Sequence, residues 1–75
     1  MDYTEILAIA KEKLGKEYQY IIDGINLRIS SGSTGGEIGS LVGFYLKTLR
    51  DQNHHAYLLL KGEIDLYLSQ FTFIK

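Results

Sequence analysis

The 75-residue sequence contains no cysteine and no tryptophan. Without cysteine the chain cannot form a disulfide, and the thiolate ligands of most structural zinc sites are missing as well. The absence also fits a protein that works in a reducing compartment. Domains of this length bury only ~60% of their unfolded surface, so disulfides or metals often supplement their stability. Since neither is signalled, we expect tight packing or the association of two copies into a homodimer.

Long apolar runs and blocks of like charge are absent too. No segment reaches the ~20 apolar residues of a membrane-spanning helix, and the first residues, Met1 to Glu5, are acidic where a secretory signal would be basic. Eight basic and nine acidic residues alternate along the chain. No basic footprint is therefore available for a phosphate backbone, which argues against nucleic acid and membrane surfaces as partners. We expect a cytoplasmic protein of bacterial, phage or other mobile-element origin.

The composition is that of a folded protein, with 45% apolar residues, and the length leaves room for one domain over residues 1–75. A first helix starts at a capping box, because Asp2 precedes Glu5 by three residues. Gly15 follows the last periodic residue, where a left-handed helix cap is expected. The apolar residues at helical spacing in between are Ile6, Leu7, Ala10 and Leu14.

A β-hairpin is the next predicted element. Asp23-Gly24 is a strong two-residue turn signal, because glycine tolerates the positive φ of a type I′ turn. Apolar and polar residues alternate on both sides, and the register of the turn brings six apolar residues onto one face. These six are Tyr18, Tyr20, Ile22, Ile25, Leu27 and Ile29. Turn chemistry and pattern agree, so this face is assigned to the core.

A second helix follows the Ser/Gly-rich stretch. Thr34 and Glu37 have capping-box spacing, and an apolar stripe continues to about Arg50. The stripe comprises Ile38, Leu41, Val42, Tyr45 and Leu49. Gly39 and Gly43 lie inside this helix, where each costs about 1 kcal/mol relative to alanine.

With Gly35, these two glycines form a strip at a spacing of four. We expect close packing against another segment of the chain there, and a contact with a partner or a second copy is the functional alternative.

The last third favours a second hairpin. Ala56 to Leu60 is a continuous apolar run, as in a strand covered on both faces, and Lys61-Gly62 can turn the chain back. Alternation then resumes at Glu63, and a bulge near Ser69-Gln70 would explain its later change of phase. A short helix from Glu63 to Phe71 is the alternative. The order helix, hairpin, helix, hairpin predicts an α+β fold, with a four-stranded antiparallel sheet and both helices on one face.

The Ser/Gly-rich loop is one candidate site. Hydroxyls, backbone N–H groups and a following helix N-terminus can together seat an anion such as a phosphate or nucleotide. The loop lacks the P-loop and dinucleotide-binding patterns, and Glu37 would repel a phosphate. The simpler interpretation is a connection in which Thr34 caps the helix. The candidate ligands of the anion are Ser31, Ser33, Thr34, Gly35 and Gly36.

No constellation indicates catalysis, a metal or a cofactor. His54 and His55 are adjacent, so they cannot both face one point on a helix or strand, and only Asp51 lies nearby as a further ligand. No serine lies in a nucleophile-type turn. We assign both histidines to a solvated turn and expect a protein that is not an enzyme and needs no cofactor.

Tyrosine is the one suggestive excess, with six residues. Tyrosine combines a large contact area with a polar tip and is enriched in protein interfaces. In the strand interpretation, Tyr67 shares an exposed face with Glu63 and Asp65, and we predict these three as a recognition patch. Exposed edge strand and solvated carboxylates are the simpler explanation for that face.

The leading hypothesis for function is therefore a small non-enzymatic module that binds another protein, as an inhibitor or antagonist does. The alternative is a small-ligand or nucleotide-binding protein that uses the loop 31–36, as a homodimer.

Overall fold

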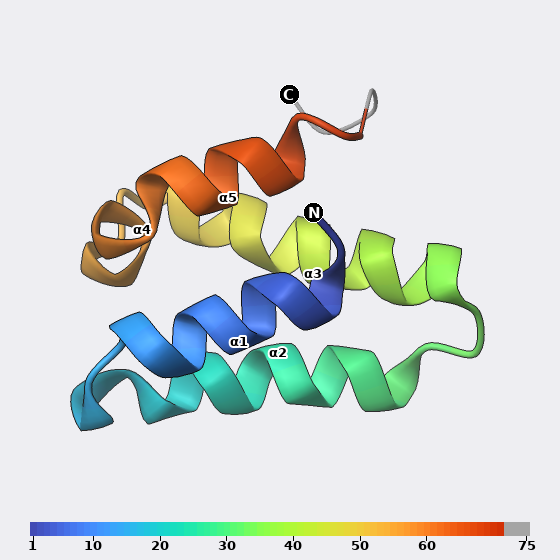
Figure 1. Ribbon diagram of the computed structural model, residues 1–75, viewed down its shortest axis with the longest axis horizontal. Coiled ribbons are helices and arrows are strands. Elements are labelled where there is room, and N and C mark those ends of the chain that lie inside the picture. The colour runs from blue at the N-terminus through green and yellow to red at the C-terminus, as the bar shows by residue number, and fades with distance from the viewer. Residues whose placement is uncertain (72–75) are drawn as a thin grey trace.

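The computed structural model describes residues 1–71, and within that range it contains helices and no strand. In chain order the elements are α1 (Tyr3–Lys13), the short 3-10 helix η1 (Lys16–Tyr18), α2 (Gln19–Ser31), α3 (Gly35–Asp51), α4 (His55–Leu59) and α5 (Lys61–Leu68). In Figure 1, α1 lies along α2, the chain returns through α3, and α5 runs back across the opposite side of the bundle. The predicted α+β fold with a four-stranded sheet is therefore wrong.

The two predicted helix starts are confirmed. The Asp2 carboxylate accepts a hydrogen bond from the backbone N–H of Glu5 at 2.9 Å, and the Thr34 hydroxyl accepts one from the N–H of Glu37 at 3.1 Å. Each cap satisfies a backbone donor that has no partner inside the helix. The predicted left-handed cap at Gly15 is wrong, because α1 ends earlier, with Leu14 in an extended conformation. No glycine among residues 1–71 has a positive φ.

The hairpin predicted at Asp23-Gly24 is wrong, because both residues lie in the middle of α2. The apolar residues of this segment fit both the two-residue period of a strand and a helical period of about 3.6 residues. Ile22 and Ile25 would face the core in a strand pair, and in the helix they also share a buried face with Ile21. The assumed outer position of Ile21 and inner position of Leu27 are reversed, since Ile21 is 1% and Leu27 62% exposed.

Gly24 serves close packing between α2 and α3. A Cβ atom at this position would lie 2.5 Å from the hydroxyl oxygen of Tyr45 and 2.7 Å from its ring carbon Cζ. Arg28 contacts both residues. Its guanidinium lies over the Tyr45 ring, 4.0 Å from the ring centre, and donates to the backbone carbonyl of Gly24 at 3.0 Å. The glycine that suggested a turn is thus required where a tyrosine side chain crosses a helix backbone.

The second hairpin, predicted at Lys61-Gly62, is also wrong. Both residues belong to the first turn of α5, and Leu60 joins α4 to α5. The alternative of a short helix from Glu63 to Phe71 is closer to the structure, although α5 begins at Lys61 and ends at Leu68. No bulge is present at Ser69-Gln70, where the chain forms a turn after the helix.

One core joins the helices. Ile6 and Ala10 from α1 meet Ile25 from α2, while Val42 and Leu46 from α3 are fully buried beside them. From the C-terminal part the same cluster takes Ala56, Tyr57, Leu60, Ile64, Tyr67 and Leu68. Because residues from both ends of the described chain share this core, α4 and α5 are held in fixed positions relative to η1 and α2, where the candidate site lies.

Candidate functional site

The predicted recognition patch is not a common exposed face. Tyr67 is 1% exposed, and its hydroxyl donates to the backbone carbonyl of Gly39 at 2.8 Å. The expected exposure of Tyr67 is therefore wrong, because the segment is a helix and this residue lies on its inner side. Burial raises the pKa of the Tyr67 hydroxyl to about 12, and the negative charge of Asp2 adds to the effect.

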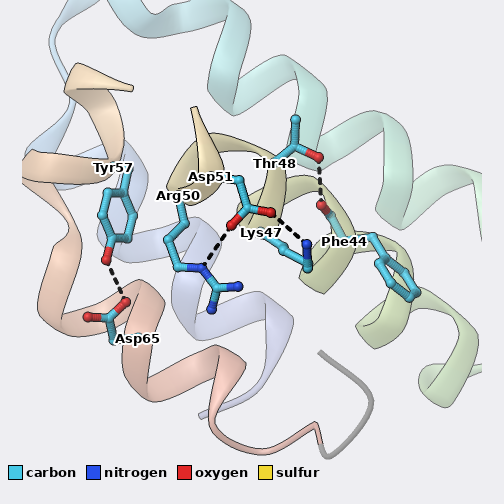
Figure 2. Close-up of polar contacts among 7 residues, drawn as sticks. All are labelled: Phe44, Lys47, Thr48, Arg50, Asp51, Tyr57 and Asp65. Carbon is cyan, nitrogen blue, oxygen red and sulfur yellow. Dashed lines mark hydrogen bonds and ion pairs between the residues drawn. The ribbon is translucent and has the colours of Figure 1, made fainter. Parts of the chain in front are cut away.

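The two carboxylates of that patch have partners within the chain. Glu63 accepts from the ammonium of Lys13 at 2.7 Å, which joins α5 to α1 and lowers the pKa of Glu63. Asp65 accepts from Lys61 at 2.9 Å and from the hydroxyl of Tyr57 at 2.8 Å, the contact drawn in Figure 2. The hydrogen bond from Lys61 is the main cause of the lowered pKa of Asp65. These carboxylates fasten helices to one another.

The Ser/Gly-rich loop is shorter than predicted and uses its hydroxyls locally. Ser31 belongs to α2 and donates to the carbonyl of Leu27, while Ser33 donates to the carboxylate of Glu37 at 3.0 Å. Thr34 caps α3, as expected from its spacing. The remaining members, Gly35 and Gly36, have open space where side chains would be. These side chains do not converge on one point, so the structure gives no specific support to an anion site here.

The glycine strip of α3 faces the protein's own core over part of its length. Gly39 and Gly43 are buried, and a Cβ at Gly39 would lie 3.7 Å from the Tyr67 hydroxyl oxygen. Gly35, by contrast, is exposed. At this distance a Cβ would make an ordinary van der Waals contact, so the close approach expected at this strip is not found at Gly39.

Four aromatic rings cluster where η1 and the start of α2 meet the α3–α4 connection. Tyr20 pairs with His54 at 2.8 Å between the hydroxyl oxygen and Nε2, and Tyr18 hydrogen-bonds to Nδ1 of His55. The ring centre of Tyr18 lies 5.8 Å from that of His54 and 6.4 Å from that of Tyr20. Such tilted and edge-on arrangements are favourable for aromatic pairs. The cluster joins residues that are 34 and 37 positions apart.

His54 also caps α4, and this second bond fixes its tautomer. Its Nδ1 accepts a hydrogen bond from the backbone N–H of Ala56 at 3.0 Å. In the neutral ring the proton therefore resides on Nε2, which donates to the hydroxyl oxygen of Tyr20. The Tyr20 hydroxyl keeps its own proton for an outside acceptor.

The exposed side of α4 extends the aromatic cluster with leucines. Leu58 and Leu59 are 49% and 44% exposed, and helical spacing places both beside His55. Tyr20 is 56% exposed. No Asp, Glu, Lys or Arg occurs between Asp51 and Lys61 in the sequence. Tyr18 and His54 are half-buried beneath these exposed side chains. We call the whole set the Tyr–His surface: Tyr18, Tyr20, His54, His55, Leu58 and Leu59.

A charged border lies on one side of the uncharged α3–α4 connection. At the end of α3, Asp51 accepts from the ammonium of Lys47 at 2.6 Å and from Nε of Arg50 at 3.3 Å. Figure 2 shows these three side chains together, with Thr48 bonded to the carbonyl of Phe44 one turn earlier. The hydrogen bond from Lys47 is the main cause of the lowered pKa of Asp51.

Within residues 1–71, the cluster lacks the partners that a hydrolytic triad or a metal site would need. Neither imidazole is hydrogen-bonded to a carboxylate or to a serine or threonine hydroxyl within residues 1–71. The nucleophile and orienting acid of a hydrolytic triad are therefore missing from the cluster. The same residues contain no group of three or more His, Cys, Asp or Glu that could hold a metal ion.

Sequence reasoning missed this surface for two reasons. Tyr18 and Tyr20 were assigned to a buried hairpin face, and His54 and His55 to a solvated turn. The stretch from Gln52 to Leu60 lacks Asp, Glu, Lys and Arg, but it also supplies Ala56, Tyr57 and Leu60 to the core, so its composition did not single out an exposed surface.

Comparisons with known proteins do not add a family to this picture. No family model matches the sequence, and the searches of curated proteins and of solved structures each find no match. Among the helices of residues 1–71, none combines the length and apolar character needed to cross a bilayer.

Proposed function

We propose that this protein is a binding module for another protein and that the Tyr–His surface is its contact site. The observation that carries the proposal is the ring cluster of Tyr18, Tyr20, His54 and His55, of which Tyr20 and His55 are exposed and the other two half-buried. Two exposed leucines extend it on a segment without Asp, Glu, Lys or Arg. Interface centres are rich in aromatic residues and poor in charged ones, with tyrosine among the residues that contribute most to affinity.

Preorganisation supports the same function. The hydroxyls of Tyr18 and Tyr20 are each hydrogen-bonded to a histidine nitrogen, and His54 in turn accepts from the backbone of α4. The rings therefore lose little conformational freedom when a partner covers them, which lowers the entropic cost of association. A cap, two aromatic pairs and a short helix hold one contact surface in place.

The chemistry of the surface suggests the partner. It offers aromatic faces, two leucines and hydroxyl or imidazole groups, and it has no unpaired charge of its own. A partner with a hydrophobic patch and a few polar acceptors at its border would match it. An inhibitor or antagonist would occupy such a patch on a larger protein. We place this interaction in the cytoplasm, as the sequence led us to expect.

Site-specific photo-crosslinking in the native host tests the proposal. A benzophenone amino acid replaces Leu58 in one variant and Ser30, an exposed residue on α2 about 15 Å along the helix from Tyr20, in the control. We expect a discrete crosslinked protein from position 58 and none from position 30. A crosslinking pattern that is the same at both positions would refute the Tyr–His surface as the contact site.

A further inference from the structure

A second feature, separate from the Tyr–His surface, is a cavity of about 510 Å³ at the seam between α1 and α2, which is open to solvent on one side. Small-molecule sites have volumes of roughly 300–1,000 Å³ and combine an apolar lining with a few polar groups. Here Leu14 and Ile22 supply apolar surface, Gln19 and Asn26 supply amides, and Lys11 and Lys16 supply positive charge. The cavity therefore has both the size and the mixed lining of a ligand site.

The charge of this cavity is not neutralised by the protein. Lys11 and Lys16 make no ion pair or hydrogen bond through their side chains within residues 1–71. The other lysines and arginines of that range are engaged: Lys13, Lys47, Arg50 and Lys61 in ion pairs, and Arg28 with Tyr45 and Gly24. The two lysines without a carboxylate partner thus border the same cavity.

Two carboxylates lie beside the lining of the cavity, and one of them, Asp23, accepts from Gln19 at 3.1 Å. Glu17 folds over Gly15, so that a Cβ on this glycine would lie 2.6 Å from a carboxylate oxygen of Glu17. Glu17 is not among the residues that line the cavity. Neither carboxylate forms an ion pair with Lys11 or Lys16, so both ammonium groups can still pair with a ligand.

The amides differ in what they can offer. Gln19 donates one of its two Nε2 hydrogens to Asp23 at 3.1 Å, so this amide is held in place and has one donor left. The side-chain amide of Asn26 makes no hydrogen bond within the described residues, and it can donate to a ligand oxygen. Leu14 and Ile22 are buried core residues that are 7% and 5% exposed, so each presents only a narrow apolar edge to the cavity.

We infer that the α1–α2 cavity binds a small organic anion. Its carboxylate or phosphate group pairs with Lys11 and Lys16 and accepts from Asn26, while its apolar part covers Leu14 and Ile22. The inference goes beyond the proposed protein-binding function, because none of these residues belongs to the Tyr–His surface.

NMR titration of the ¹⁵N-labelled full chain with three probes tests the inference. Hexanoate and hexyl phosphate carry the two anionic groups on the same apolar tail, and hexanamide carries the tail without charge. Each probe is added to about 20 mM, well above the dissociation constant of about 1 mM that a ligand of this size can reach. We expect at least one anion to shift the backbone amides of Gly15, Gln19 and Asn26, and hexanamide to leave them in place.

A matched pair of double variants locates the charge. Lys11→Gln/Lys16→Gln removes both cavity lysines, and Lys47→Gln/Lys61→Gln removes two that lie elsewhere. We expect Lys11→Gln/Lys16→Gln to weaken binding of the anion about tenfold and Lys47→Gln/Lys61→Gln to leave it unchanged. Only the first double variant loses hydrogen bonds between a charged group and the ligand. The inference is overturned if neither anion shifts those amides, if hexanamide shifts them equally, or if both double variants bind alike. Chemical shifts of core amides such as Ile25 report folding in every sample.

Discussion

The hydroxyl of Tyr67 donates to the backbone carbonyl of Gly39 across 2.8 Å and thereby joins α5 to α3. The residue is 1% exposed, so neither partner can exchange this bond for water. A side chain that was expected to face a binding partner is instead part of the packing between two helices.

Tyr67→Phe should lower the free energy of unfolding by about 1 kcal/mol, because the substitution leaves the buried carbonyl of Gly39 without a donor while the ring stays in place. Urea unfolding at neutral pH measures the difference. Ser30→Ala, which removes an exposed hydroxyl, is the control and should have a smaller effect. Equal stability of wild type and Tyr67→Phe would show that the bond contributes nothing.

Alkaline pH should destabilise the protein partly through the same residue. The pKa of Tyr67 is about 12 in the folded protein against an ordinary value of 10.0. Between these values the unfolded chain loses the proton while the folded chain keeps it, so stability falls as the pH rises. We expect the fall from about pH 9 to pH 11 to be smaller in Tyr67→Phe than in wild type. Parallel curves for the two proteins would contradict the assigned burial.

Gly24→Ala tests the contact between α2 and Tyr45. In an open helix position this change stabilises by about 0.4–1 kcal/mol, and Gly62→Ala, where nothing lies within 4 Å, should do so. At Gly24 the new methyl group meets the Tyr45 ring, which Arg28 holds, so we expect a loss of stability. Combination with Tyr45→Leu should restore the gain, as measured by a double-mutant cycle of unfolding free energies. A stabilising Gly24→Ala in the wild-type background is the contrary result.

The ion pair between Lys13 and Glu63 should make stability depend on acid pH. The hydrogen bond from Lys13 lowers the pKa of Glu63 below its ordinary 4.5. A lowered folded pKa means that the stabilisation is present above the unfolded value and is lost as the pH falls through the folded one. Glu63→Gln should therefore cost about 0.5 kcal/mol near neutral pH and nothing at about pH 2. Glu12→Gln, at an exposed position, is the control, and equal losses at both pH values would reject the pair.

The parts of the fold that the sequence predicted correctly depend on local contacts. Asp2 and Thr34 each cap a helix through a backbone N–H three positions away, so neighbouring residues were enough to find α1 and α3. In α2 the apolar residues fit a period of two and a helical period equally, and Asp23-Gly24 favoured the wrong one. Only the crossing of Tyr45 over Gly24, 21 residues away by number, explains that glycine.

The candidate site depends on contacts that are more distant still. Tyr20 and His54 become neighbours because α3 returns the chain to the start of α2. Neither residue carries a local sign of the other. Tyr67 was placed with Glu63 and Asp65 by alternation alone, and the helical path of α5 separates it from solvent.

Binding of the crosslinked partner, once purified, is the most direct test of the Tyr–His surface. Isothermal titration would compare wild type with Tyr20→Ala, and with Leu27→Ser as a matched control. Leu27 is similarly exposed on α2, at 62% against 56% for Tyr20, but lies about 10 Å farther along the helix. We predict that Tyr20→Ala weakens binding by about thirtyfold, as the loss of a central tyrosine does, and that Leu27→Ser leaves the affinity unchanged. Unchanged affinity of Tyr20→Ala, with its helical circular dichroism intact, would contradict the proposed function.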